Sequence, residues 1–122
     1  MFAFIPRFIL SILFMLNTQI THIHTNCMAR ENDWYKHQVI TATNHGVGKY
    51  FNFIFSGGLN YQIEHHLFPN VNHCHHPYIQ PIVKRICEKH SVEYKEFNGY
   101  NDAFLSYYKH VIQMSKLNEK QD

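Results

Sequence analysis

An apolar run occupies residues 1–16 and sets the first limit on what this chain can fold into. Its sequence, MFAFIPRFILSILFML, is broken only by Pro6, Arg7 and Ser11, and a polar segment follows at once. A helix that spans the hydrocarbon core of a bilayer needs about 20 residues, so the run is short for a complete span. Three interpretations remain: a secretory signal, a buried helix of a soluble protein, and a transmembrane helix that lacks its N-terminal part.

The flanking residues separate these interpretations only narrowly. A secretory signal should end near a small-residue cleavage site, and the next segment, NTQITHIHTNCMA, offers no clear one. A buried helix of a soluble protein is possible for a run of 10–14 residues, but this run is apolar on every side. A shortened transmembrane helix fits both the length and the abrupt polar end, and the histidine motifs farther along the chain decide the choice.

Composition narrows the class of protein. The 122 residues are 45% hydrophobic and 16% aromatic, too apolar for a disordered chain. Their number suffices for one small domain or for the tail of a larger one. The net charge of +2 comes without a basic cluster, so nucleic acid is not an expected partner. Cys27, Cys74 and Cys87 are odd in number and lack C-x-x-C spacing, which argues against a disulfide framework and a cysteine-based zinc site.

Helical signals dominate the middle of the chain. Asp33 can cap a helix that runs through WYKHQVITATN, residues 34–44. The run KYFNFIF, residues 49–55, suits either a strand or a buried helix by its periodicity alone. Gly57 and Gly58 follow, and glycines at this point would allow two backbones to approach closely.

Two amphipathic helices are expected in the last third. The first follows helical spacing with an inner face made of Ile79, Ile82, Val83, Ile86 and Cys87. Residues 92–97 are short and extended. Asn101 can cap the second helix. Its expected inner face comprises Phe104, Leu105, Tyr108, Val111 and Ile112.

The most specific motif is Gln62-Ile63-Glu64-His65-His66, followed by Leu67-Phe68-Pro69, in a chain with 11 histidines. On a helix, residues 62, 65 and 66 are i, i+3 and i+4, so one amide and two imidazoles share a face. Imidazole binds transition metals readily. Glu64 points away from that face and suits a structural or supporting role, and Pro69 should end the helix. The order of residues differs from the zinc-protease motif H-E-x-x-H.

The segment GGLNYQIEHHLFP, from Gly57 to Pro69, resembles the third histidine box of the front-end fatty-acid desaturases, in which Q-x-x-H-H replaces H-x-x-H-H. Residues 31–44 and 77–97 resemble the segments that flank this box in bacterial linoleoyl-CoA desaturase-like proteins. Gln19-x-x-His22 resembles the Q-x-x-H at the cytosolic end of their last transmembrane helix. The similarity extends from about residue 8 to residue 115.

This resemblance implies an all-α fold, the C-terminal part of a helical integral-membrane desaturase. Residues 1–20 would be the truncated last transmembrane helix, and residues 21–122 the cytosolic region, a helical cap over the catalytic face. The resemblance also implies a non-haem di-iron centre that uses dioxygen to remove two hydrogens from a fatty acyl chain. The implied partners are the bilayer, an acyl-CoA or acyl-lipid substrate, and an electron donor of cytochrome b5 or ferredoxin type.

Carried over by position, the iron ligands are His65 and His66, joined by His22 from the end of the last membrane helix. Gln62 stands where other desaturases place a third histidine. Because a neutral amide binds iron poorly, we expect Gln62 to hydrogen-bond a water on the metal instead. Gln19 is expected to act in the same indirect way.

The sequence departs from the family in what precedes this box. A complete desaturase has two earlier boxes, H-x-x-x-H and H-x-x-H-H, and neither occurs upstream of residue 57. His22-x-His24 has the wrong spacing. We interpret His73-Cys74-His75-His76 as a loop that resembles the family's H-x-H, or as an adventitious metal site. Three ligands cannot hold two irons, so we expect the chain to be inactive without an N-terminal desaturase half. The alternative is a non-enzymatic, histidine-rich metal-binding module at the membrane.

Overall fold

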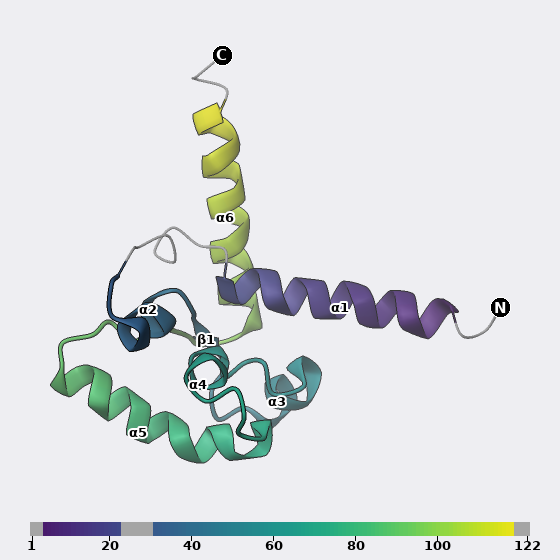
Figure 1. Cartoon of the computed structure of the whole chain (residues 1–122). Coiled ribbons are helices and arrows are strands. Elements are labelled where there is room, and N and C mark those ends of the chain that lie inside the picture. The colour runs from purple at the N-terminus through teal and green to yellow at the C-terminus, as the bar shows by residue number, and fades with distance from the viewer. Residues whose placement is uncertain (1–3, 23–30, 119–122) are drawn as a thin grey trace.

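The structure, a computed structural model, describes residues 4–22 and 31–118. Its elements are α1 (Phe4–His22), α2 (Trp34–Ile40), β1 (Asn44–His45), α3 (Tyr50–Ser56), α4 (Gln62–Leu67), the 3-10 helix η2 (His73–His75), α5 (His76–Lys89), β2 (Glu96–Phe97) and α6 (Tyr100–Asn118). The helices α2 to α5 form one group, and α1 and α6 extend away from it and meet at its edge (Figure 1). The expected helical fold is confirmed, with one very short strand pair added.

The apolar run forms most of α1, which continues without a break to His22. Its 19 residues extend about 28 Å at the rise of an α-helix, close to the thickness of a bilayer core. Length and composition would allow α1 to cross a membrane, although a signal sequence meets the same criteria. Phe4 and Phe8 are 83% and 68% exposed, which does not suit the core helix of a soluble protein. The buried part of α1 is its polar end, at Asn17, Ile20 and Thr21.

The helix α2 begins where the sequence predicts. The carboxylate of Asp33 accepts a hydrogen bond from the backbone N–H of Lys36 at 3.0 Å, as an N-cap does. The helix ends at Ile40, before the predicted end at Asn44, because the chain leaves it to enter β1.

The strand β1 is the point where distant segments join. It pairs in parallel with β2, Asn44 opposite Glu96. On its other side, the backbone N–H of His45 donates to the carbonyl of Asn60 at 3.1 Å. Beside these strands, a small core lies between α2, α4 and α5 and contains Val39, Ala42, Ile63, Val83 and Cys87. Of the cysteines, Cys74 is exposed and Cys87 buried, both as free thiols. Cys27 and His24 lie outside the described residues.

The aromatic run that suits a strand or a buried helix forms the helix α3. Of the two predicted alternatives, the helix is present, but the prediction that it is buried was wrong. Tyr50, Phe51 and Ile54 are 80%, 75% and 59% exposed in the structure. Alternation of aromatic residues indicates a common face, but it does not indicate what covers that face.

The two C-terminal helices are present, but their predicted inner faces need correction. In α5, Ile79, Val83 and Cys87 contribute to the core, whereas Ile82 and Ile86 are exposed. The buried side of α5 is completed by His76 and Gln80.

The helix α6 differs more from its prediction. It begins at Tyr100, so Asn101 lies inside its first turn and is not the cap. The five predicted inner residues are all exposed, and Ala103 and His110 are buried instead. The reason is that α6 contacts only α1 and β2 extensively within the described chain, so its apolar stripe faces outward.

Gly57 and Gly58 both adopt positive φ angles, 62° and 84°. Gly57 ends α3 as its C-cap. A Cβ at Gly58 would lie 2.8 Å from the Cβ of His73, whereas one at Gly57 would meet nothing within 4 Å. The predicted close approach is therefore real, but it brings a backbone against the His73 side chain instead of a second backbone.

Replacing Gly58 by Ala should destabilise the chain more than replacing Gly57. Both changes put a side chain at positive φ, which costs roughly 1–2 kcal/mol. Only Gly58→Ala also forces a Cβ into His73. We expect a larger fall in the midpoint of thermal unfolding for Gly58→Ala, measured by circular dichroism in detergent. Equal falls would show that His73 does not rest against Gly58 in solution.

Candidate functional site

The histidine box lies on α4, a six-residue helix that is held from outside. So short a helix is not stable alone, and its N-cap, Tyr61, makes no side-chain capping bond. The missing acceptor comes from β1, where Asn44 Oδ1 accepts a hydrogen bond from the backbone N–H of Ile63 at 2.9 Å. A residue 19 positions earlier in the chain thus caps the helix that carries the box.

Glu64, in the middle of the box, is fully buried. Its carboxylate accepts hydrogen bonds from Asn44 Nδ2 at 2.6 Å and from the Tyr94 hydroxyl at 2.8 Å. Burial raises the pKa of the Glu64 carboxyl, and these two hydrogen bonds oppose the rise. Glu64 therefore has the structural role that its place on the helix suggests, since it ties α4 to β1 and to the segment before β2.

One side of the box meets the end of α1. Gln62 Nε2 lies 3.1 Å from Nε2 of His22 and 3.1 Å from Nε2 of His66. The rings of His22 and His66 stack, with centroids 4.9 Å apart and planes inclined by 26°. His22 lies 40 positions before Gln62 in the chain. The fold nevertheless brings His22, Gln62 and His66, all singled out in the sequence, into contact. Gln19 lies one turn before His22 and is half-buried, and its indirect role stays a prediction.

His65 faces a second histidine group, which the sequence analysis named but did not relate to the box. Its Nδ1 lies 3.3 Å from Nε2 of His73 on η2. The ring of His76, the first residue of α5, lies 5.2 Å from that of His73 and 6.2 Å from that of His65, between centroids. The cluster that we interpreted as a loop is thus part of the box's surroundings. The signal that could have found it is Gly58, whose missing side chain makes room for His73.

Burial favours the neutral form of the two imidazoles in the box. It is the largest cause of their pKa shifts, and it lowers the pKa of His65 and brings that of His66 to about 4. Burial also lowers the pKa of His76 to about 4. A neutral imidazole keeps one nitrogen lone pair, which is what a metal ion requires of it.

Several buried polar atoms here have no hydrogen-bond partner in the described chain: Gln62 Oε1, His66 Nδ1, and both ring nitrogens of His76. Such atoms are costly unless water or an ion satisfies them. Neutral imidazoles are donors that suit iron, and the box presents them in two groups, His66 with His22 and His65 with His73 and His76. The residues fit a metal to this extent, although in residues 4–22 and 31–118 no three His, Cys, Asp or Glu side chains are arranged to hold an ion.

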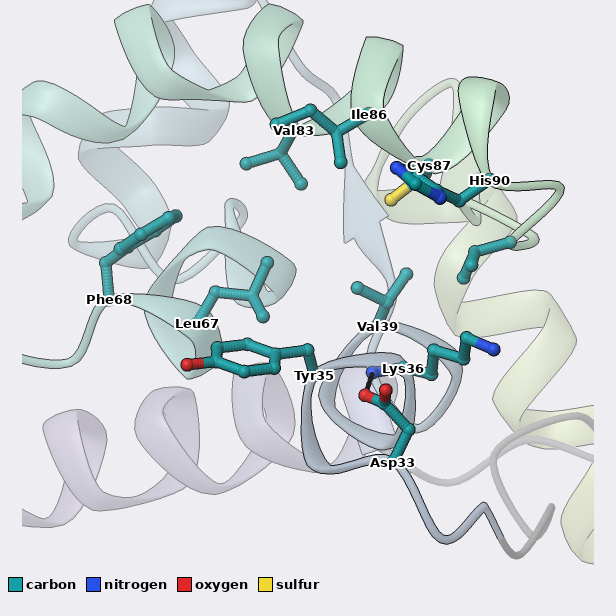
Figure 2. Close-up of a pocket in the computed structure, with 11 residues that line it drawn as sticks. Asp33, Tyr35, Lys36, Val39, Leu67, Phe68, Val83, Ile86, Cys87 and His90 are labelled. Atoms are coloured by element: carbon teal, nitrogen blue, oxygen red, sulfur yellow. Dashed lines mark hydrogen bonds between the residues drawn. The ribbon is translucent and has the colours of Figure 1, made fainter.

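An apolar groove of about 340 Å³ opens between α2, α4 and α5. Figure 2 shows Val39, Leu67 and Val83 pointing into it from these three helices. Leu67 directly follows His66, so the polar face of α4 and the groove lie next to one another on the same short helix.

The family model described as fatty acid desaturase matches residues 1–98. The chain belongs to the fatty acid desaturase family. It is 38% identical over 88 residues to an sn-1 linoleoyl-lipid 6-desaturase of Synechocystis sp., a match that covers 72% of this chain and 24% of that protein. It is 39% identical over 92 residues to a fatty acid desaturase 2-like protein of Mus musculus, with 75% and 19% covered. It is 42% identical over 78 residues to an acyl-lipid (8-3)-desaturase of Physcomitrium patens, with 64% and 16% covered.

The desaturase chain thus spans a quarter or less of the length of these relatives. No solved structure matches it significantly. The resemblance found in the sequence is confirmed by the family model and by these relatives.

Replacing Tyr94 by Phe should lower the free energy of unfolding by roughly 1.5–3 kcal/mol at neutral pH, since it removes a hydrogen bond to a buried carboxylate. The hydroxyl opposes the rise in the pKa of Glu64 above its ordinary 4.5, so its loss raises that pKa further. The stability difference between wild type and variant should therefore grow as the pH rises through the raised pKa, and level off above it.

Denaturant unfolding over a series of pH values measures this difference. Tyr78→Phe is the control, since Tyr78 is 76% exposed and its variant should match wild type throughout. A difference for Tyr94→Phe that did not change with pH would contradict a bond to an ionising Glu64.

Proposed function

We propose that this chain supplies the third-histidine-box portion of an iron-dependent fatty-acid desaturase. The observation that carries the proposal is the meeting of α1 and α4, where Gln62 Nε2 lies 3.1 Å from both His22 Nε2 and His66 Nε2. Membership of the family supports the class of reaction. Iron, when bound, supplies the dioxygen chemistry that removes two hydrogens from a fatty acyl chain.

The residues that would hold iron are His22, His65 and His66. Each role follows from position: His22 ends the apolar helix, and His65 and His66 occupy the box. Gln62 lies between the imidazoles of His22 and His66, and its Oε1, which has no partner in the described chain, would accept a hydrogen bond from a water on the metal. The buried bonds of Glu64 keep α4 from rotating, so the two adjacent histidines stay directed to opposite groups.

The proposal includes a membrane position. Residues 1–20 would be part of the last transmembrane helix, and residues 21–122 would lie on the cytosolic side. The exposed apolar surface of α1 and its buried polar end support this arrangement. The bilayer, a fatty acyl substrate and an electron donor of cytochrome b5 or ferredoxin type are the proposed partners.

A di-iron centre needs more ligands than these residues supply. We propose that a desaturase portion with the boxes H-x-x-x-H and H-x-x-H-H provides the others, either as more of the same chain or as a second chain. The match to a quarter or less of each relative's length supports this requirement.

Joined to such a portion, the chain should bind two irons and desaturate an acyl chain. His65→Ala and His66→Ala should each reduce the iron content and abolish turnover, because each removes a proposed ligand. His90→Ala is the control, since His90 is exposed at the end of α5. Iron analysis and gas chromatography of acyl products measure the two effects. Full activity in either box variant would contradict the ligand role, and a single metal with no activity beside any such portion would favour the non-enzymatic module.

A further inference from the structure

We propose that His73 is a positioning residue, which holds His65 in the tautomer with its proton on Nδ1 and leaves Nε2 free to bind the metal. The inference rests on the proposed function insofar as His65 is a metal ligand. Its geometric basis is the distance of 3.3 Å between His65 Nδ1 and His73 Nε2.

Two neutral imidazoles that face each other through one nitrogen each allow two arrangements of their protons. Each ring has one N–H and one lone pair, so one ring must donate and the other accept. If His65 accepted at Nδ1, its proton would lie on Nε2 and would block metal binding there. If His65 donates from Nδ1, its Nε2 carries the lone pair. Histidines that bind metals commonly donate their other N–H to a neighbouring acceptor, which fixes the direction of the ring.

The backbone around His73 is arranged to bring it to His65. Gly58 leaves space, since a Cβ at that position would lie 2.8 Å from His73 Cβ and 3.3 Å from His73 Cγ. Asn72 caps η2, with Oδ1 accepting from the backbone N–H of Cys74 at 3.1 Å. His76 packs against the rings of both His65 and His73. His75, two residues farther along the same short helix, is exposed and provides a matched control.

The first test reads the tautomer directly in the metal-free 122-residue chain in detergent. Long-range proton–nitrogen NMR of labelled histidine shows which ring nitrogen of His65 carries the proton. We expect Nδ1 in wild type and in His75→Phe. His73→Phe keeps a flat ring but has no acceptor, so His65 should shift to the Nε2–H form that free imidazoles of histidine prefer. His73→Gln retains a side-chain carbonyl and should restore part of the Nδ1–H form.

A proton on Nε2 of His65 in wild type would overturn the proposal, and so would a tautomer that His73→Phe leaves unchanged. Circular dichroism of each variant shows that the comparison is made on folded chains. A purely structural role for His73 would alter the thermal midpoint without the rescue by Gln.

The second test measures iron held by the joined desaturase against a chelator. His73→Phe should weaken iron binding roughly 10- to 100-fold, as loss of a ligand's hydrogen-bond partner does, with a smaller loss for His73→Gln and none for His75→Phe. Unchanged binding in His73→Phe would overturn the positioning role. A wild-type complex without iron would instead overturn the proposed function, and the tautomer result would still decide what His73 does to His65.

Discussion

The buried contact between Asn44, Glu64 and Tyr94 is the interaction on which the rest of this structure depends. Asn44 lies 20 positions before Glu64 in the chain, and Tyr94 lies 30 positions after it. Both donate hydrogen bonds to the carboxylate of Glu64, which is fully buried. A six-residue helix has too few internal hydrogen bonds to stand alone, so α4 exists only because these partners hold it. Because Glu64 lies between Gln62 and His65 on this helix, loss of its two hydrogen bonds would free α4 to rotate and so redirect the imidazoles of His65 and His66.

The parts of the structure that sequence can predict are those set by near neighbours along the chain. The cap at Asp33 depends on a residue three positions away, and it is present. Of the face predicted for Gln62, His65 and His66, Gln62 and His66 lie together, whereas His65 lies against His73. The same reasoning failed for α6, because spacing shows which residues share a face and not whether a partner covers it. Among the described side chains of that helix, Ala103 and His110 are buried, and neither belongs to its most apolar stripe.

For the site, too, the sequence predicted some contacts and not others. The meeting of His22 and His66 followed from a resemblance, since nothing local relates two residues on separate helices. The contact of His73 with the box was not predicted, because it depends on two separate features. Gly58 has no side chain and so leaves room for His73, and Asn72 begins the turn that carries it. A glycine before a histidine box can be required by a positive φ angle or by a close neighbour. At Gly58 both reasons apply.

The helix α1 links the two environments that the proposed reaction needs. Its first turns expose large apolar side chains, and its last residue, His22, contacts Gln62. A helix is rigid over this length, and one added residue would turn His22 by about 100° and move it by about 1.5 Å. The depth of α1 in a bilayer and the direction of its imidazole are therefore not independent. If α1 is the membrane anchor, the same helix that sets the height of the chain also sets the height and direction of the His22 imidazole.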